Sequence, residues 1–165
     1  MEELEIVRCT PDVLVALGAA MPSQHHRARF GVQLAGAGVY LVALVADAPA
    51  GHALLRWRTT NDALLRLGIA EPYVEALAVA PAHRRRGVAT ALMRSAEQIA
   101  RSDGHATIGL HVGVTNAPAR ALYRGLGYVD AGLGTCEITW SYRDDRGVER
   151  TEGEICTYFT RQLMP

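Results

Sequence analysis

The chain has 165 residues, 49% of them hydrophobic and 21% charged, and equal numbers of acidic and basic side chains give a formal net charge of zero. That length predicts a single domain over residues 1–165, and the neutral balance gives no overall field that would favour nucleic acid or an anionic membrane. No apolar run approaches the roughly 20 residues of a membrane helix. An acidic start without a signal-peptide core and only three cysteines indicate a cytoplasmic protein without a disulfide framework.

The chain is expected to open with a short strand and two helices. Residues 4–8 predict the strand. Thr10 followed by Pro11 is typical of a helix N-cap with proline at the first helical position, and this helix is expected to run to Ala20. A second helix is expected after Ser23, which would cap it, and the glycines that follow would end it.

Three strands and a long helix are predicted next. Residues 39–46 and 51–58 are expected to be strands that flank a hairpin loop at 47–50. A further strand is expected over residues 72–80. Residues 87–101 place their apolar side chains at helical spacing, and the glycine soon after them predicts where this helix ends.

The last third of the chain predicts a strand, a short helix and a long hairpin. The strand covers residues 106–112 and the helix covers 117–126. Two long strands then flank a turn at 145–147, whose glycine suits the left-handed position of a three-residue hairpin loop. Counting back in register from this turn places Cys136 opposite Cys156, both as free thiols.

The turn before the long helix carries a concentration of positive charge. Arg84, Arg85 and Arg86 come directly before Gly87. The first turn of a helix leaves backbone N–H groups without partners and carries partial positive charge, so it binds phosphate readily. Gly87 lets the backbone approach a ligand closely. We therefore expect a nucleotide diphosphate here, with a solvated basic turn as the alternative.

Two sequence blocks resemble the GNAT superfamily of N-acetyltransferases. The spacing Arg84-x-x-Gly87-x-Ala89 resembles the family signature [Q/R]-x-x-G-x-[G/A], and it matches neither G-x-x-x-x-G-K-[ST] nor G-x-G-x-x-G. A second block resembles the family pattern L-x-V-x-x-x-N-x-x-A-x-x-L-Y-x-x-x-G-[F/Y]. The two blocks together cover residues 73–128. The residues that match the second pattern are Leu110, Val112, Asn116, Ala119, Leu122, Tyr123, Gly127 and Tyr128.

The resemblance implies an α/β fold and a direct acyl transfer. In the family fold, a mixed central sheet of about six to seven strands has helices on both faces, and the fourth and fifth strands splay apart. An amine attacks the thioester of acetyl-CoA, and the thiolate leaves without an acyl-enzyme. The enzyme must position both substrates, remove a proton from the ammonium group, stabilise the oxyanion and protonate the sulfur. Acetyl-CoA is then the co-substrate, and no metal is expected.

The resemblance also implies which residues bind the coenzyme. Backbone N–H groups of the basic turn would hold the pyrophosphate, and the preceding strand would bind the pantetheine arm. Asn116 would contact this arm while it caps its helix. The implied set is Leu77, Ala78, Val79, Arg84, Arg85, Arg86, Gly87, Val88, Ala89, Thr90, Asn116, Ala119 and Tyr123.

Two residues are candidates for proton transfer. Tyr123 matches the family tyrosine that is implied to protonate the leaving thiolate, and an ordinary core tyrosine is the alternative. Glu75 lies inside an apolar strand, where we expect it to share a face with Leu77 and Val79. Partial desolvation would make Glu75 a general base, acting directly or through water. The alternative for Glu75 is an ion pair with an arginine.

Other residues are reserve candidates for the role of proton acceptor and for the binding site of the amine. His111, which is also typical of a structural histidine, and a water chain ending at Glu71 are reserve proton acceptors. His25 and His26 are expected to lie either in a wall of the acceptor site or on a solvated helix face.

The acceptor is expected to be a small primary amine. The turn region also resembles that of aminoglycoside 3-N-acetyltransferases, but this likeness lies in the coenzyme half. The alternatives are acetylation of protein N-termini or lysines, and a non-catalytic acyl-CoA-binding module. The last hairpin exposes strands that allow a homodimer.

Overall fold

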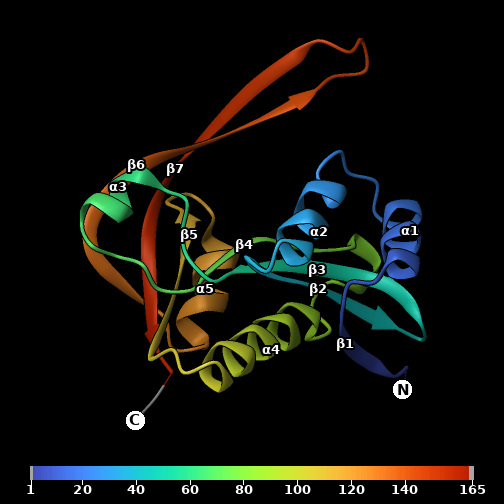
Figure 1. Ribbon diagram of the computed structural model, residues 1–165, viewed down its shortest axis with the longest axis horizontal. Coiled ribbons are helices and arrows are strands. Elements are labelled where there is room, and N and C mark those ends of the chain that lie inside the picture. Colours follow the sequence, from blue (N-terminus) through green and yellow to red (C-terminus); the bar gives the residue numbers. More distant parts are fainter. Residues whose placement is uncertain (1, 164–165) are drawn as a thin grey trace. The chain divides into compact units, whose positions relative to one another are not determined.

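The computed structural model describes residues 2–163, which divide into two compact units. The first contains the residues up to Ile108 together with Leu163, and the second contains Gly109–Gln162. Seven strands and the helices between them confirm the predicted α/β class (Figure 1). No helix within residues 2–163 is long and apolar enough to cross a membrane.

The elements follow one another in the order that the sequence predicted, with two short helices added. In the first unit they are β1 (Leu4–Arg8), α1 (Pro11–Ala20), α2 (His26–Leu34), β2 (Gly38–Val45), β3 (Ala48–Arg56), α3 (Asp62–Arg66), β4 (Tyr73–Val79), the 3₁₀ helix η1 (Pro81–His83) and α4 (Val88–Ser102). The boundary between the units falls inside β5 (Thr107–Gly113). The remaining elements are α5 (Ala117–Gly125), β6 (Val129–Arg143) and β7 (Glu149–Gln162).

Helices cover both faces of the antiparallel strands β1 to β4 in the first unit (Figure 1). On one face, Tyr40 and Leu54 pack with Leu17 of α1 and Phe30 of α2 in a buried apolar cluster. On the other face, a Cβ at Gly51 would lie 3.2 to 3.3 Å from side chains of α4. This glycine lets α4 approach β3 closely, which fixes the position of the turn before α4.

The first helix begins as predicted, but the second does not. The hydroxyl of Thr10 accepts a hydrogen bond from the N–H of Val13 at 3.2 Å, which confirms the N-cap of α1. The predicted cap at Ser23 is wrong, because α2 begins at His26 after a residue without a side-chain cap. Ser23 instead accepts from the N–H of His25 at 3.1 Å and shapes the turn before the helix.

The hairpin between β2 and β3 turns earlier than the sequence suggested. The predicted loop at 47–50 is wrong, because Ala48 already pairs with Val45. Ala46 and Asp47 form the turn, with φ angles of 49° and 64°. Two positive φ values give a two-residue turn whose twist matches the flanking strands. The sequence lacked the Asn-Gly or Asp-Gly signal that marks such a turn.

The final hairpin has the predicted register. The N–H of Asp144 donates to the carbonyl of Val148 at 3.0 Å, and Gly147 has a φ of 73°. Cys136 lies opposite Cys156, as predicted, and both are free thiols. The helix α3 was missed, although Asn61 caps it by accepting from the N–H of Leu64 at 3.0 Å.

Candidate functional site

The basic turn before α4 presents backbone N–H groups that lack acceptors. Gly87 is the N-cap with a φ of 82°, and no side chain caps this helix. Arg85 also has a positive φ, of 60°. Within residues 2–163, no backbone carbonyl accepts from the N–H groups of residues 85–90. Left-handed residues in such a turn aim amides into one concavity, and the helix dipole adds partial positive charge. The turn therefore has the donors that an anion requires.

The three arginines of this turn have different surroundings. The Nε of Arg84 donates to the carbonyl of Val79 at 3.1 Å, which ties the turn to the end of β4. The Nη1 of Arg86 lies 3.9 Å from the Oε2 of Glu2, and both side chains are exposed. Arg85 has no hydrogen-bond or ion-pair partner among residues 2–163. Its guanidinium group is therefore free to meet a phosphate.

The turn also has room for a ligand. A Cβ at Gly87 would meet no atom within 4 Å. Val88 is buried and anchors the helix, whereas Ala89 and Thr90 are half-buried. Amides without acceptors, an open approach and a free guanidinium fit the pyrophosphate of a coenzyme.

A β-bulge interrupts β4 beside this turn. Glu75 lies opposite Leu54, whereas Ala78 lies opposite His52. The segment from Glu75 to Ala78 therefore contains one residue more than the opposite segment from His52 to Leu54. Ala76 has a φ of 60°. A bulge leaves its extra residue outside the ladder, and bulges are common beside active sites. The backbone at the bulge is therefore available to a ligand.

The bulge corrects the predicted face of Glu75. Directly opposed residues of antiparallel strands share a face. Val79 lies opposite Gly51, on the face that α4 covers, while Glu75 shares the other face with Ala78. The prediction that Glu75 shares a face with Leu77 and Val79 is therefore wrong, because the extra residue shifts the alternation by one position.

Glu75 forms an ion pair with Arg56. The Nε of Arg56 donates to the Oε1 of Glu75, and these side chains are 25% and 34% exposed, respectively. The ion pair is the alternative that the sequence left open. Sequence reasoning missed Arg56, because its position opposite Tyr73 depends on the register of two distant strands.

Replacement of Glu75 by glutamine is expected to lower the acetylation rate about 100-fold near pH 7. The rate should recover partly at high pH, where the free amine is already abundant. Steady-state pH–rate profiles measure this. The matched control is Arg56→Gln, which breaks the same ion pair but keeps the carboxylate. An unaltered profile in Glu75→Gln would move the role to His111 or to a water chain ending at Glu71.

A buried polar cluster lies between α2 and the strands. The Nδ1 of His26 lies 2.7 Å from the hydroxyl of Tyr40, and its Nε2 lies 2.6 Å from the carbonyl of Met21. The alternative of a solvated face is therefore wrong for His26, which is only 3% exposed. His52 packs edge-on against His26, and the ring centroids are 5.1 Å apart. Burial, with a smaller effect of the Arg29 charge, lowers the pKa of His52 to about 3.

The free energy of unfolding is expected to fall as pH drops below 6.5. The unfolded chain binds a proton at His52 near pH 6.5, whereas the folded chain binds it only near pH 3. The stability from this difference is complete above pH 6.5 and decreases by about 1.4 kcal/mol per pH unit below it. Urea unfolding at pH 7.5, 5.5 and 4.5 measures the slope. His52→Gln should have a shallower slope, and equal slopes would contradict this origin.

The second unit carries the predicted residues of α5. The Oδ1 of Asn116 accepts from the N–H of Ala119 at 3.2 Å, which confirms the predicted cap. Tyr123 is 8% exposed and packs edge-on against Tyr128, with ring centroids 5.9 Å apart. Burial raises the pKa of Tyr123 to about 12, so its hydroxyl stays protonated at neutral pH. Among residues 2–163 this hydroxyl has no hydrogen-bond partner and is free to donate.

His111 is a weaker proton acceptor than the sequence suggested. Burial lowers the pKa of His111 to about 4, and its ring packs against Tyr158 with centroids 5.2 Å apart. The imidazole is therefore neutral at pH 7 but has little affinity for a proton there. This favours the alternative that His111 is a structural histidine and not the proton acceptor.

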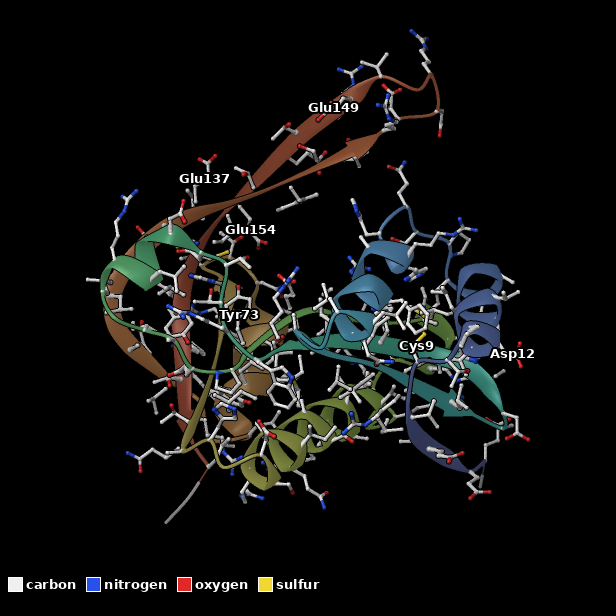
Figure 2. The ribbon with its side chains drawn as sticks, in the orientation of Figure 1. Cys9, Asp12, Tyr73, Glu137, Glu149 and Glu154 are labelled. Carbon is white, nitrogen blue, oxygen red and sulfur yellow. The ribbon has the colours of Figure 1, made fainter. Side chains whose placement is uncertain are left out.

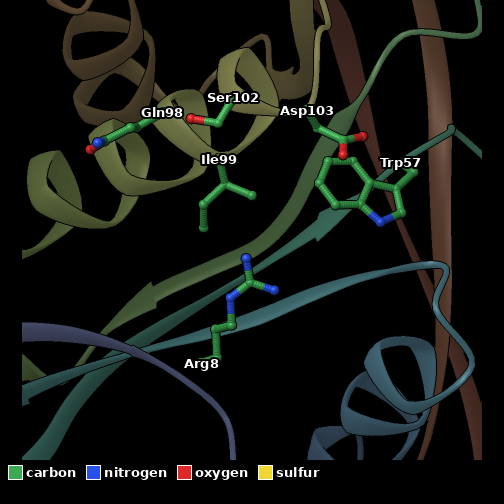
Figure 3. Close-up of a pocket in the computed structure, with 6 residues that line it drawn as sticks. All are labelled: Arg8, Trp57, Gln98, Ile99, Ser102 and Asp103. Atoms are coloured by element: carbon green, nitrogen blue, oxygen red, sulfur yellow. The ribbon is translucent and has the colours of Figure 1, made fainter.

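A separate depression in the first unit contains none of the predicted site residues (Figure 3). Arg8 from β1, Trp57 after β3 and the C-terminal part of α4 line a cavity of about 420 Å³. The ring of Trp57 stacks on His105 at 5.7 Å between centroids. The remaining lining residues are Gln98, Ile99, Ser102 and Asp103.

The chain is similar in sequence to known acetyltransferases. The sequence profile described as the acetyltransferase (GNAT) family matches residues 11–128. The chain is 37% identical over 93 residues to the streptothricin acetyltransferase of Streptomyces lavendulae. That match covers 56% of the chain and 45% of the relative, so the chain spans less than half of the curated relative's length.

Solved structures with the same fold include two of particular relevance. A nourseothricin acetyltransferase is 28% identical, with a TM-score of 0.56, over 78% of this chain and 66% of that one. A Salmonella typhimurium protein solved with its cofactor acetyl-CoA is 17% identical, with a TM-score of 0.66, over 98% of this chain and 94% of that one. The second likeness shows the fold alone.

Proposed function

Because the chain belongs to the GNAT acetyltransferase family, we propose that it transfers the acetyl group of acetyl-CoA to a primary amine of a small molecule. Membership makes it an acyltransferase, and the family uses acetyl-CoA. The observation that carries the proposal is the turn at residues 85–90, whose N–H groups lack acceptors at the start of α4. A diphosphate satisfies such donors better than water, since its charge also meets the helix dipole.

The proposed reaction is a direct attack of the neutral amine on the thioester carbon. Glu75, or a water molecule that it holds, takes the proton from the ammonium group. The backbone N–H groups at the bulge of β4 stabilise the oxyanion, because a bulge frees donors from the ladder. The hydroxyl of Tyr123 donates to the thiolate as it leaves. Acetyl-CoA supplies the activated acyl group, and the mechanism needs no metal.

The proposed acceptor is a basic antibiotic or a similar polyamine. This proposal is supported by two similar proteins that are named as acetyltransferases of streptothricin and of nourseothricin, both more than 25% identical to this chain over the matched part. Peptide N-termini and lysines are the alternative acceptors. We further propose that the protein works in the cytoplasm. The exposed strands of the last hairpin also allow two copies of the chain to pair as a homodimer.

A thiol-release assay tests the proposed function. The protein is incubated with acetyl-CoA and a panel of streptothricin, aminoglycosides, simple amines and peptides, and the acetylated products are identified by mass spectrometry. Release with a basic antibiotic supports the proposal, whereas release only with peptides supports the alternative acceptor class. Coenzyme binding without any release would support a non-catalytic acyl-CoA-binding module.

A further inference from the structure

The strand β6 lies at the edge of the sheet. It comes last in the order of the strands, and β7 is its only neighbour among residues 2–163. Residues 137–143 pair with 149–155 without interruption, since the register shift of β6 lies before Thr135. This segment contains no proline, lysine or bulge, which are devices that keep an edge strand from pairing with another chain. Its free edge is therefore open to a further strand.

The backbone of every second residue turns to this free edge. In an antiparallel pair, hydrogen-bonded and non-hydrogen-bonded positions alternate. The N–H of Asp144 donates to the carbonyl of Val148 at 3.0 Å, so the even-numbered residues of the hairpin bond across it. The carbonyl of Ile155, an odd-numbered residue, instead accepts from the N–H of Val114 on the other side of β7. The odd-numbered residues among 137–143 therefore turn their N–H and C=O groups to the free edge.

The charges along this edge complement those of a second copy of the same strand. Glu137 and Arg143 each lie three residues from Trp140, on opposite sides of it. When two β6 strands pair in antiparallel fashion with Trp140 at the centre, Glu137 of each copy lies opposite Arg143 of the other. Opposite charges directly across two strands stabilise their pairing, whereas like charges destabilise it. In the same register, Ile138 of each copy lies opposite Tyr142 of the other.

This register is the antiparallel one in which the two charges meet. Centring the pair on Glu137 or on Arg143 would place like charges opposite each other. Centring it on Ser141 would place Glu137 opposite Asp145. The charges therefore favour Trp140 as the centre and disfavour these alternatives.

Both charged side chains are exposed and able to reach a second copy. Glu137 has no hydrogen-bond or ion-pair partner within residues 2–163, and it projects from a different side of the hairpin than Glu154 (Figure 2). Its carboxylate lies over Gly153, and no bond holds it there. Arg143 donates to the carbonyl of Gly147 at 3.0 Å. A guanidinium has five N–H donors, so this bond is compatible with an ion pair to a carboxylate.

Trp140 occupies the position where the side chains of the two copies come closest. Because the odd-numbered residues carry the hydrogen bonds at the free edge, Trp140 falls at a non-hydrogen-bonded position, where opposed Cα atoms are about 4.5 Å apart. Its side chain is 42% exposed in the single chain. Pairing brings the two rings together, and aromatic pairs attract each other beyond the effect of burying their surface.

We infer that two copies of this chain associate through β6, in an antiparallel ladder over residues 137–143 with Trp140 at its centre. The same surface then serves both copies, as in a closed two-fold dimer. The inference gives the edge and the register of the homodimer that the exposed strands of the hairpin allow. It does not depend on acetyl transfer, because it concerns only the strand edge.

Two charge-reversal variants test the register. Glu137→Arg places arginine opposite Arg143, and Arg143→Glu places glutamate opposite Glu137. Each variant alone should therefore dimerise at least about tenfold more weakly than the unsubstituted protein, because both symmetric pairs become repulsive. An equimolar mixture of the two variants should recover the affinity to within about threefold, since every pair in the mixed dimer again joins opposite charges. Sedimentation velocity from low to high micromolar protein measures the dissociation constants.

The matched control is Glu149→Arg, which makes the same change of charge on β7, one strand away from the free edge. It should change the dissociation constant less than about threefold. An unsubstituted protein that stays monomeric at every concentration would overturn the inference. A dimer that both charge reversals leave unchanged would also overturn it, because such a dimer uses another surface. A mixture that associates no better than either variant alone would overturn the register.

Discussion

Gly87→Asp is expected to lower the affinity for acetyl-CoA at least about 100-fold. The new carboxylate would lie among the N–H groups of residues 85–90, where we propose that the pyrophosphate binds. Two like charges about 4 Å apart repel by about 4 kcal/mol at the effective dielectric constant of a protein surface, and 1.4 kcal/mol is tenfold in affinity. Isothermal titration calorimetry with acetyl-CoA measures the loss.

The matched control is Gly87→Asn. Both substitutions place a side chain at a φ of 82°, where nothing lies within 4 Å of the new Cβ. Asn and Asp both tolerate this left-handed conformation, so backbone strain and steric bulk are nearly equal and only the charge differs. Thermal melting should show that both variants fold. Unchanged affinity in Gly87→Asp would exclude the turn as the coenzyme site, and equal losses in both variants would assign the effect to bulk.

Local signals in the sequence were sufficient to predict several helix ends and the turn of the final hairpin. Thr10, Asn116 and Gly147 each act on residues within four positions, and the structure has the two caps and the turn in the predicted places. The pairing of Cys136 with Cys156 followed from the length of one tight turn, because register propagates along an uninterrupted ladder.

Non-local features were not predictable in the same way. The bulge at Ala76 inserts one residue into β4, and nothing in the alternation of its neighbours marks it. The face of Glu75 and its ion pair with Arg56 depend on that bulge and on pairing between distant strands. His26 is buried because Tyr40 and the carbonyl of Met21 satisfy both ring nitrogens, a solution that helical periodicity cannot reveal. Local backbone features beside the candidate site, such as the helix start after Gly87 and the cap at Asn116, could thus be predicted, whereas contacts between side chains of different strands could not.

Tyr123→Phe is expected to lower kcat about 100-fold or more while coenzyme affinity stays nearly unchanged. The substitution removes the proposed proton donor and keeps the ring, which is 8% exposed and packs against Tyr128. Because burial raises the pKa of Tyr123 to about 12, the hydroxyl remains protonated throughout the range from pH 6 to pH 10. The fold loss in kcat should therefore be constant across that range, unlike the pH-dependent loss expected for Glu75→Gln.

Thiol release at saturating substrates measures kcat, and calorimetry measures the affinity for acetyl-CoA. Tyr128→Phe is the matched control, because it removes a hydroxyl from the neighbouring buried ring at a position without a proposed role in proton transfer. This control should keep kcat within about threefold. If Tyr123→Phe also stays within about twofold of the unsubstituted protein, protonation of the thiolate does not depend on this tyrosine. Solvent water would then be the donor, since a thiol that ionises near pH 8.5 leaves as a fairly stable anion.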